Sequence, residues 1–63
     1  MDIKEHIAKR QKEKRTHLLV LEYIEKLNND VGLKESTMNE VRAKISSKVN
    51  FCDRSIADHV KLL

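Results

Sequence analysis

The side chains that could do chemistry in this sequence are mainly basic, and they are concentrated near its start. Residues 1–17 hold six bases against three acids, a balance of +3; the bases are Lys4, Lys9, Arg10, Lys12, Lys14 and Arg15. Residues 18–63 hold seven bases and seven acids, so the whole net charge of +3 lies in the first segment. Such a segment attracts polyanions, of which nucleic acid is the commonest. The same mixture of Lys and Glu is also typical of a solvated helix face with i,i+4 ion pairs.

Nucleophiles and metal ligands are few and dispersed. Cys52 is the single cysteine, which excludes an internal disulfide and a cysteine-based zinc site, and no base is placed by sequence to activate its thiol. The three histidines, His6, His17 and His59, lack the spacing of metal ligands. One glycine excludes a glycine-rich phosphate loop, and 63 residues leave little room for a catalytic cleft. We therefore expect no enzyme, no metal site and no cofactor.

The elements that must position these side chains are expected to be helices. The chain is 40% hydrophobic and 37% charged, as in a small folded domain, and it contains no proline. Helix-favouring residues run from about 3 to 29, where Asn29 or Gly32 can supply the left-handed residue that ends a helix. A second helix is predicted to begin at Thr37, because Thr37 and Glu40 form a capping box.

A break is expected at residues 46–50, where two serines and an asparagine weaken helix propensity. Apolar residues repeat at helical spacing on both sides of it: Met38, Val41 and Ile45 before, and Ile56, Val60 and Leu63 after. A third helix is then predicted to begin at Cys52 or Asp53. The sequence thus predicts one helical domain over 1–63, with a basic helical arm at 1–17 and a three-helix core at 18–63.

Residues 37–63 resemble the helix-turn-helix unit of DNA-binding regulators, including the winged-helix type. The resemblance rests on the segment Arg-Ala-Lys-Ile-Ser-Ser-Lys-Val-Asn-Phe-Cys-Asp-Arg-Ser-Ile-Ala-Asp-His-Val. Asn50 stands in the turn, where that family usually has glycine, and Ser46 stands where it usually has alanine. Phe51 would anchor the turn in the core, and Ile56 would anchor the recognition helix. The resemblance implies an all-α, three-helix helix-turn-helix domain with a long N-terminal helix, its wing absent or truncated.

The same resemblance implies which residues would contact double-stranded DNA. The third helix would enter the major groove and present Arg54, Ser55, Asp58, His59 and Lys61. An arginine near the start of a recognition helix can donate two hydrogen bonds to a guanine edge. Phosphates would be held by bases of the second helix and of the arm, namely Lys44, Lys48, Lys9, Arg10, Lys12, Lys14 and Arg15.

The first helix carries two apolar stripes when its residues are placed about 100° apart. The denser stripe is expected to face the core, and it consists of Val20, Tyr23, Ile24, Leu27 and Val31. The sparser stripe consists of Ile3, Ile7, Leu18 and Leu21. Since a monomer of this size has nothing left to cover the sparser stripe, it is predicted to be the seam of a homodimer. Scattered surface leucines are nevertheless ordinary.

The sequence predicts a small dimeric DNA-binding protein, a transcription regulator of the kind found among prokaryotic, plasmid and viral proteins. It has no apolar run of membrane-spanning length and no signal-peptide core, and a single cysteine suits a reducing compartment, so a cytoplasmic location is expected. The alternative is a helical adaptor or inhibitor that docks on a protein through its long first helix, which the neutral balance of residues 18–63 favours. RNA binding by the basic helix also stays open, although one Tyr and one Phe offer little base stacking.

Overall fold

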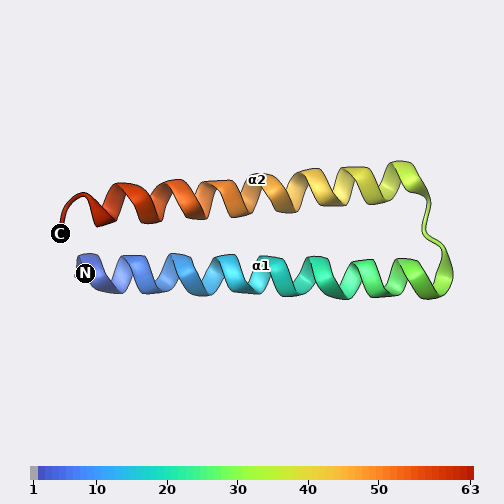
Figure 1. Cartoon of the computed structure of the whole chain (residues 1–63), viewed down its shortest axis with the longest axis horizontal. Helices are drawn as coiled ribbons and strands as arrows, with labels where there is room; N and C mark the ends of the chain where they lie inside the picture. Colours follow the sequence, from blue (N-terminus) through green and yellow to red (C-terminus); the bar gives the residue numbers. More distant parts are fainter. Residues whose placement is uncertain (1) are drawn as a thin grey trace.

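The computed structural model describes residues 2–63, and within them two long helices run antiparallel to each other (Figure 1). Helix α1 comprises Ile3–Val31 and helix α2 comprises Glu35–Val60. A short turn joins them, so the two ends of the chain lie at the same end of the molecule (Figure 1). The principal extents are 45 × 16 × 13 Å, which describe a rod. The fold is a helical hairpin whose elements touch along their whole length.

The turn is built by a left-handed glycine and an asparagine side chain. Gly32, one of the two residues predicted to end α1, has a φ of 67°, and its N–H donates to the carbonyl of Asn28 at 2.8 Å. The side-chain oxygen of Asn28 accepts a second hydrogen bond from the N–H of Leu33 at 2.9 Å. Helix α2 then begins at Glu35, two residues before the predicted Thr37, with Lys34 as a cap that makes no side-chain hydrogen bond.

The predicted three-helix fold is wrong, because α2 runs without interruption through residues 46–50. Among residues 2–63 no residue other than glycine has a positive φ, so Asn50 does not form a turn. Met38, Ile45 and Cys52 are buried at intervals of seven residues, and this repeat crosses the expected break. Serine and asparagine cost a helix only about 0.5 kcal/mol each relative to alanine, which this burial outweighs. The helix-turn-helix unit at 37–63 is therefore absent from the structure.

The two helices meet along a seam with the alternating three- and four-residue spacing of paired helices. Helix α2 contributes the buried Met38, Ile45 and Cys52 and the half-buried Val41, Val49, Ser55, Ile56 and His59. Helix α1 contributes half-buried residues, namely Ile3, His6, Ile7, Arg10, Glu13, Lys14, His17, Leu21, Ile24, Glu25 and Asn28. The half of the seam next to the turn is mainly apolar, whereas the half next to the chain ends contains most of the charged and histidine side chains.

The side of α1 that faces α2 is not the denser apolar stripe that the sequence suggested. Of that stripe only Ile24 is half-buried. The others stay exposed: Val20 by 46%, Tyr23 by 70%, Leu27 by 39% and Val31 by 62%. Two helices of similar length must touch along their whole length, and only the face that carries Ile3 and Ile7 extends apolar contacts into the first half of α1.

Candidate interaction surface

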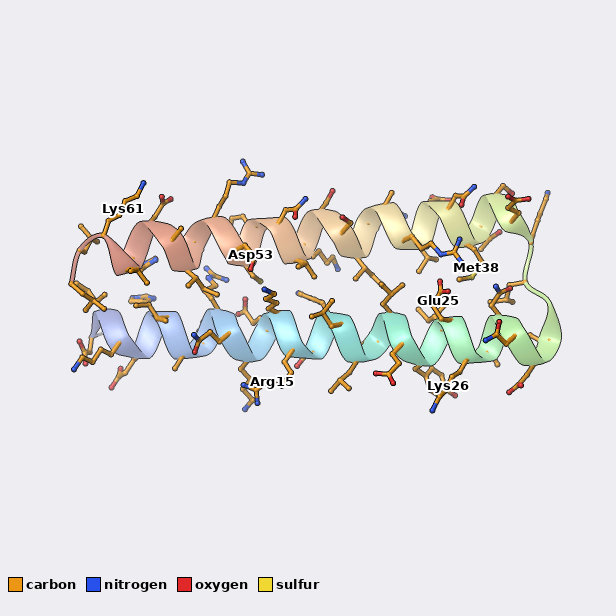
Figure 2. The ribbon with its side chains drawn as sticks, viewed as in Figure 1. Arg15, Glu25, Lys26, Met38, Asp53 and Lys61 are labelled. Atoms are coloured by element: carbon orange, nitrogen blue, oxygen red, sulfur yellow. The ribbon has the colours of Figure 1, made fainter. Side chains whose placement is uncertain are left out.

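Four of the five side chains predicted to read DNA, namely Arg54, Ser55, Asp58 and His59, line one open groove of about 340 Å³ together with Phe51. Arg54, Asp58 and Lys61 are exposed, and Figure 2 shows Lys61 directed away from α1. Ser55 and His59 are half-buried and lie closer to the seam. His59 uses its ring to stack on His6, with the ring centroids 5.1 Å apart, and its Nδ1 lies 2.6 Å from the Ser55 carbonyl oxygen. The groove therefore extends from the exposed Arg54 and Asp58 to the half-buried Ser55 and His59 beside α1.

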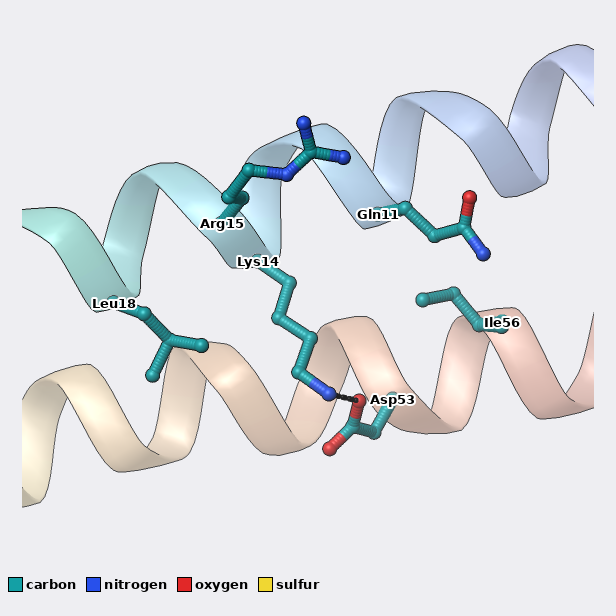
Figure 3. A pocket seen from close by; sticks show the side chains of 6 residues that line it. All are labelled: Gln11, Lys14, Arg15, Leu18, Asp53 and Ile56. Carbon is teal, nitrogen blue, oxygen red and sulfur yellow. Dashed lines mark ion pairs between the residues drawn. The ribbon is translucent and has the colours of Figure 1, made fainter.

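Two bases of the arm are engaged in contacts that hold the hairpin together. Lys14 Nζ lies 2.7 Å from the carboxylate of Asp53 on α2 (Figure 3). Arg10 donates to Glu13 at 2.8 Å, and its guanidinium lies 5.1 Å from the ring centroid of Phe51. The Arg10 hydrogen bond holds the pKa of the Glu13 carboxyl below its ordinary value, although partial desolvation opposes this. Both arm residues therefore already have partners within the chain.

The remaining bases of the arm are directed to solvent. Lys9, Lys12 and Arg15 are exposed, and Figure 2 shows Arg15 pointing away from α2. Among residues 2–63 no ion pair within 4.0 Å involves these three or Lys4. On α2, Lys44 pairs with Glu40 at 3.3 Å, while Lys48 is exposed. The cationic side of the molecule is thus the outer side of the first half of α1.

An open groove lies between the helices in the polar half of the seam. Its volume is about 390 Å³, and it is lined by Gln11, Lys14, Arg15, Leu18, Asp53 and Ile56 (Figure 3). The Lys14–Asp53 ion pair crosses it, as Figure 3 shows, and Leu18 and Ile56 supply apolar surface. Cys52 is buried nearby, with its Sγ 4.0 Å from a Glu13 oxygen. Within the described residues no cluster of three or more His, Cys, Asp and Glu side chains could hold a metal ion.

An ion pair between Glu25 on α1 and Arg42 on α2 was not predicted from the sequence. Arg42 donates from Nε and Nη2 to the two carboxylate oxygens of Glu25, at 2.6 and 3.1 Å. Figure 2 shows Glu25 directed toward α2. These two residues are 17 positions apart, so no local spacing could have indicated the pair.

Helix α1 carries an exposed apolar surface on the side that the sequence predicts to face the core. We call it the α1 apolar face, and it consists of Leu19, Val20, Tyr23, Leu27 and Val31. With Leu18 placed at 0° on an ideal helix, the face covers about 100–220°, whereas the seam is centred near 280°. Of the four residues that the sequence predicts for a dimer seam, Ile3, Ile7 and Leu21 are half-buried between the helices, and Leu18 is 45% exposed on another side of α1. The three- and four-residue spacing of the seam, followed from Ile3 to Asn28, would have distinguished the side that packs on α2 from the α1 apolar face.

Comparison of the chain with protein-family models, with curated protein sequences and with solved structures found no match. Across residues 2–63, neither helix contains a segment that is both long enough and apolar enough to cross a membrane.

Proposed function

We propose that this protein is a helical interaction module that associates with another helix through the α1 apolar face. The observation that carries the proposal is the exposure of five large apolar side chains on one side of one helix. Contiguous apolar surface of this kind marks interaction sites, because its burial removes apolar area from water. Single exposed leucines would carry no such meaning. Here Val20, Leu27 and Val31 recur at the spacing of residues that pack between helices.

The orientation of the face supports association with a further helix. The α1 apolar face and the seam lie roughly 120° apart around α1 on an ideal helix. A helix within a bundle contacts two neighbouring helices on two different sides. In α1 these two sides would be the seam and the α1 apolar face. Helix α2 has no equivalent face, because its large exposed apolar residues, Phe51 and Val60, are nine positions apart and point in opposite directions. Association is therefore a property of α1.

A matched pair of substitutions tests the proposal. Leu27→Glu charges the α1 apolar face, and Leu18→Glu places the same charge on the opposite side of the same helix. The two leucines are similarly exposed, at 39% and 45%. Each variant is compared with the unchanged chain for self-association by light scattering and for binding of an apolar fluorescent dye. We expect Leu27→Glu to abolish whichever of the two the unchanged chain shows, and Leu18→Glu to preserve it. Equal behaviour of the two variants would contradict the proposal.

A second candidate function is polyanion binding through the outer side of the arm. It is favoured by one observation: Lys4, Lys9, Lys12 and Arg15 are exposed along α1 and make no ion pair among residues 2–63. Such contacts are electrostatic and independent of base sequence, because a phosphate contact carries no base information. This candidate replaces base reading by a third helix, which the continuous α2 does not provide.

A fluorescence-anisotropy titration with mixed duplex DNA tests the second candidate. The variant Lys9→Gln, Lys12→Gln, Arg15→Gln removes three charges from the arm. The control Lys34→Gln, Lys44→Gln, Lys61→Gln removes three exposed charges elsewhere. Between about 50 and 200 mM salt, the arm variant should flatten the logarithmic salt dependence by up to about 3, since each phosphate contact contributes about 0.9. Equal slopes for the two variants, or no binding by the unchanged chain at low salt, would exclude the arm as a site.

A further inference from the structure

We infer that the α1 apolar face is covered by a second copy of this chain, in an antiparallel pair of α1 helices. The inference rests on the proposed function and identifies the partner. Four properties of the hairpin lead to it: its surface area, its small core, the symmetry of the face and the distribution of charge.

The surface area of the hairpin exceeds that of a compact monomer. It exposes 4998 Å², and its mass is 7.4 kDa. A compact monomer of that mass exposes about 4,200 Å². The excess is on the order of 800 Å², which is about the area that one partner buries in a standard specific interface. The hairpin thus carries enough surplus surface for one partner of its own size.

The core of a single hairpin is small. In residues 2–63 only Met38, Ile45 and Cys52 are buried, and α1 contributes no buried residue. The radius of gyration is 14.6 Å, against about 11 Å for a compact domain of this length. Small chains without disulfides or metals commonly gain their missing stability by oligomerisation. A second copy is always present in solution, so it supplies this stability without a further component.

The face is self-complementary about a two-fold axis. Its residues span 19–31, and the midpoint between Val20 and Val31 lies between positions 25 and 26. When two α1 helices cross there in opposite directions, Val20 of one copy faces Val31 of the other. Tyr23 then lies beside Leu27 of the other copy. This is the isologous arrangement of a symmetric dimer, in which one patch on each copy covers the same patch on the other.

The distribution of charge selects the antiparallel orientation. Each chain carries its balance of +3 in residues 1–17, outside the α1 apolar face. A parallel pair would place the two arms side by side, with like charges in contact. An antiparallel pair centred between 25 and 26 directs the arms away from each other. At 1.5 Å per residue, the midpoints of the two basic segments are then roughly 50 Å apart along the pair.

Sedimentation equilibrium with circular dichroism tests the inference. We expect the unchanged chain to be a dimer at micromolar concentration and Leu18→Glu to retain it. Leu27→Glu should weaken dimerisation at least tenfold, and Tyr23→Lys, at the most exposed position of the face, should act alike. Helical spectra of the variants show that they still fold. Loss of the dimer in Leu18→Glu but not in Leu27→Glu would overturn the inference. So would a monomeric unchanged chain; if that monomer bound the apolar dye through Leu27, the proposed function would survive with another partner.

Disulfide cross-linking tests the orientation. Val20→Cys and Val31→Cys chains are oxidised separately and as a mixture, and the unchanged chain, with its buried Cys52, is the control. Antiparallel pairing predicts that the mixture forms the mixed disulfide readily and that each variant alone cross-links poorly. Efficient cross-linking of each variant with itself, and none between the two, would establish a parallel pair and overturn the proposed register.

Discussion

Arg42 and Glu25 form the only bidentate pair between the helices within residues 2–63, with donor–acceptor distances of 2.6 and 3.1 Å. The fork geometry of the guanidinium matches both carboxylate oxygens, which fixes direction as well as distance. The two side chains are 44% and 40% exposed, so water screens their attraction. The pair lies in the apolar half of the seam, and its main consequence is to fix how far α2 is shifted along α1.

Acid should weaken the hairpin through this pair. The Arg42 hydrogen bond lowers the pKa of Glu25 in the folded chain, although desolvation opposes it. Because the folded pKa lies below the unfolded value of about 4.3, the contribution is complete above that value and is lost as pH falls through the folded pKa. The thermal midpoint, followed by circular dichroism, should therefore fall below about pH 5. Glu25→Gln should reduce this fall, and Glu22→Gln, at an exposed site, should not. Identical acid profiles for both variants would contradict the assignment.

Asn50 distinguishes the continuous helix from a helix-turn-helix. In the interior of α2, Asn50→Ala replaces a weak helix former with the best one and should raise the unfolding free energy by about 0.5 kcal/mol. In a turn with positive φ, the same change would cost about 1–2 kcal/mol. Urea denaturation gives the sign directly. Ser47→Ala is the control, because it lies on the exposed surface of the same helix and should also stabilise.

Gly32 should be the residue of the turn that is most sensitive to substitution. Its φ of 67° is unfavourable for residues with a Cβ, yet a Cβ built there would have no atom within 4 Å. The cost of Gly32→Ala is therefore conformational and should be about 1–2 kcal/mol. Gly32→Asn should cost less, because asparagine adopts the left-handed region more readily. Equal costs for both variants in urea denaturation would argue against a left-handed cap.

Much of the secondary structure could be predicted from the sequence, and the reasons are local. The helix-favouring composition of residues 3–29 was sufficient to predict α1, and its end was narrowed to Asn29 or Gly32, of which the structure has Gly32. The continuity of α2 could not be predicted from helix propensity, because it depends on a contact between distant residues. Cys52 is buried against α1 beside Glu13, which lies 39 positions away in the sequence. The low helix propensity of a few residues is overridden when the helix they belong to packs against another helix along its length.

The side of α1 that is buried was harder to predict than the helix itself. A search for the densest apolar stripe selects Val20 and Leu27, but the seam passes through polar side chains such as Lys14, whose partner Asp53 lies on the other helix. Hydrophobic periodicity does not register such cross-helix ion pairs. Nor does the composition of the basic arm show which of its bases face α2. Lys14 and Arg15 are neighbouring bases, yet Lys14 crosses the seam to Asp53 and Arg15 points to solvent.

Truncation of Ile45 should unfold the hairpin. Ile45 is the central member of the three buried side chains, and Ile→Ala in a core typically costs about 2–5 kcal/mol. Domains of this size rarely have more than about 3–5 kcal/mol to lose, so Ile45→Ala should lose most of its helical signal at room temperature. Ile45→Val, which removes one methyl group, should cost about 0.5–1.5 kcal/mol and stay folded. The control Val60→Ala, at a half-exposed site on α2, should change stability by no more than about 0.5 kcal/mol. If Ile45→Ala were as stable as Val60→Ala, the buried repeat of α2 would not be what holds the helices together.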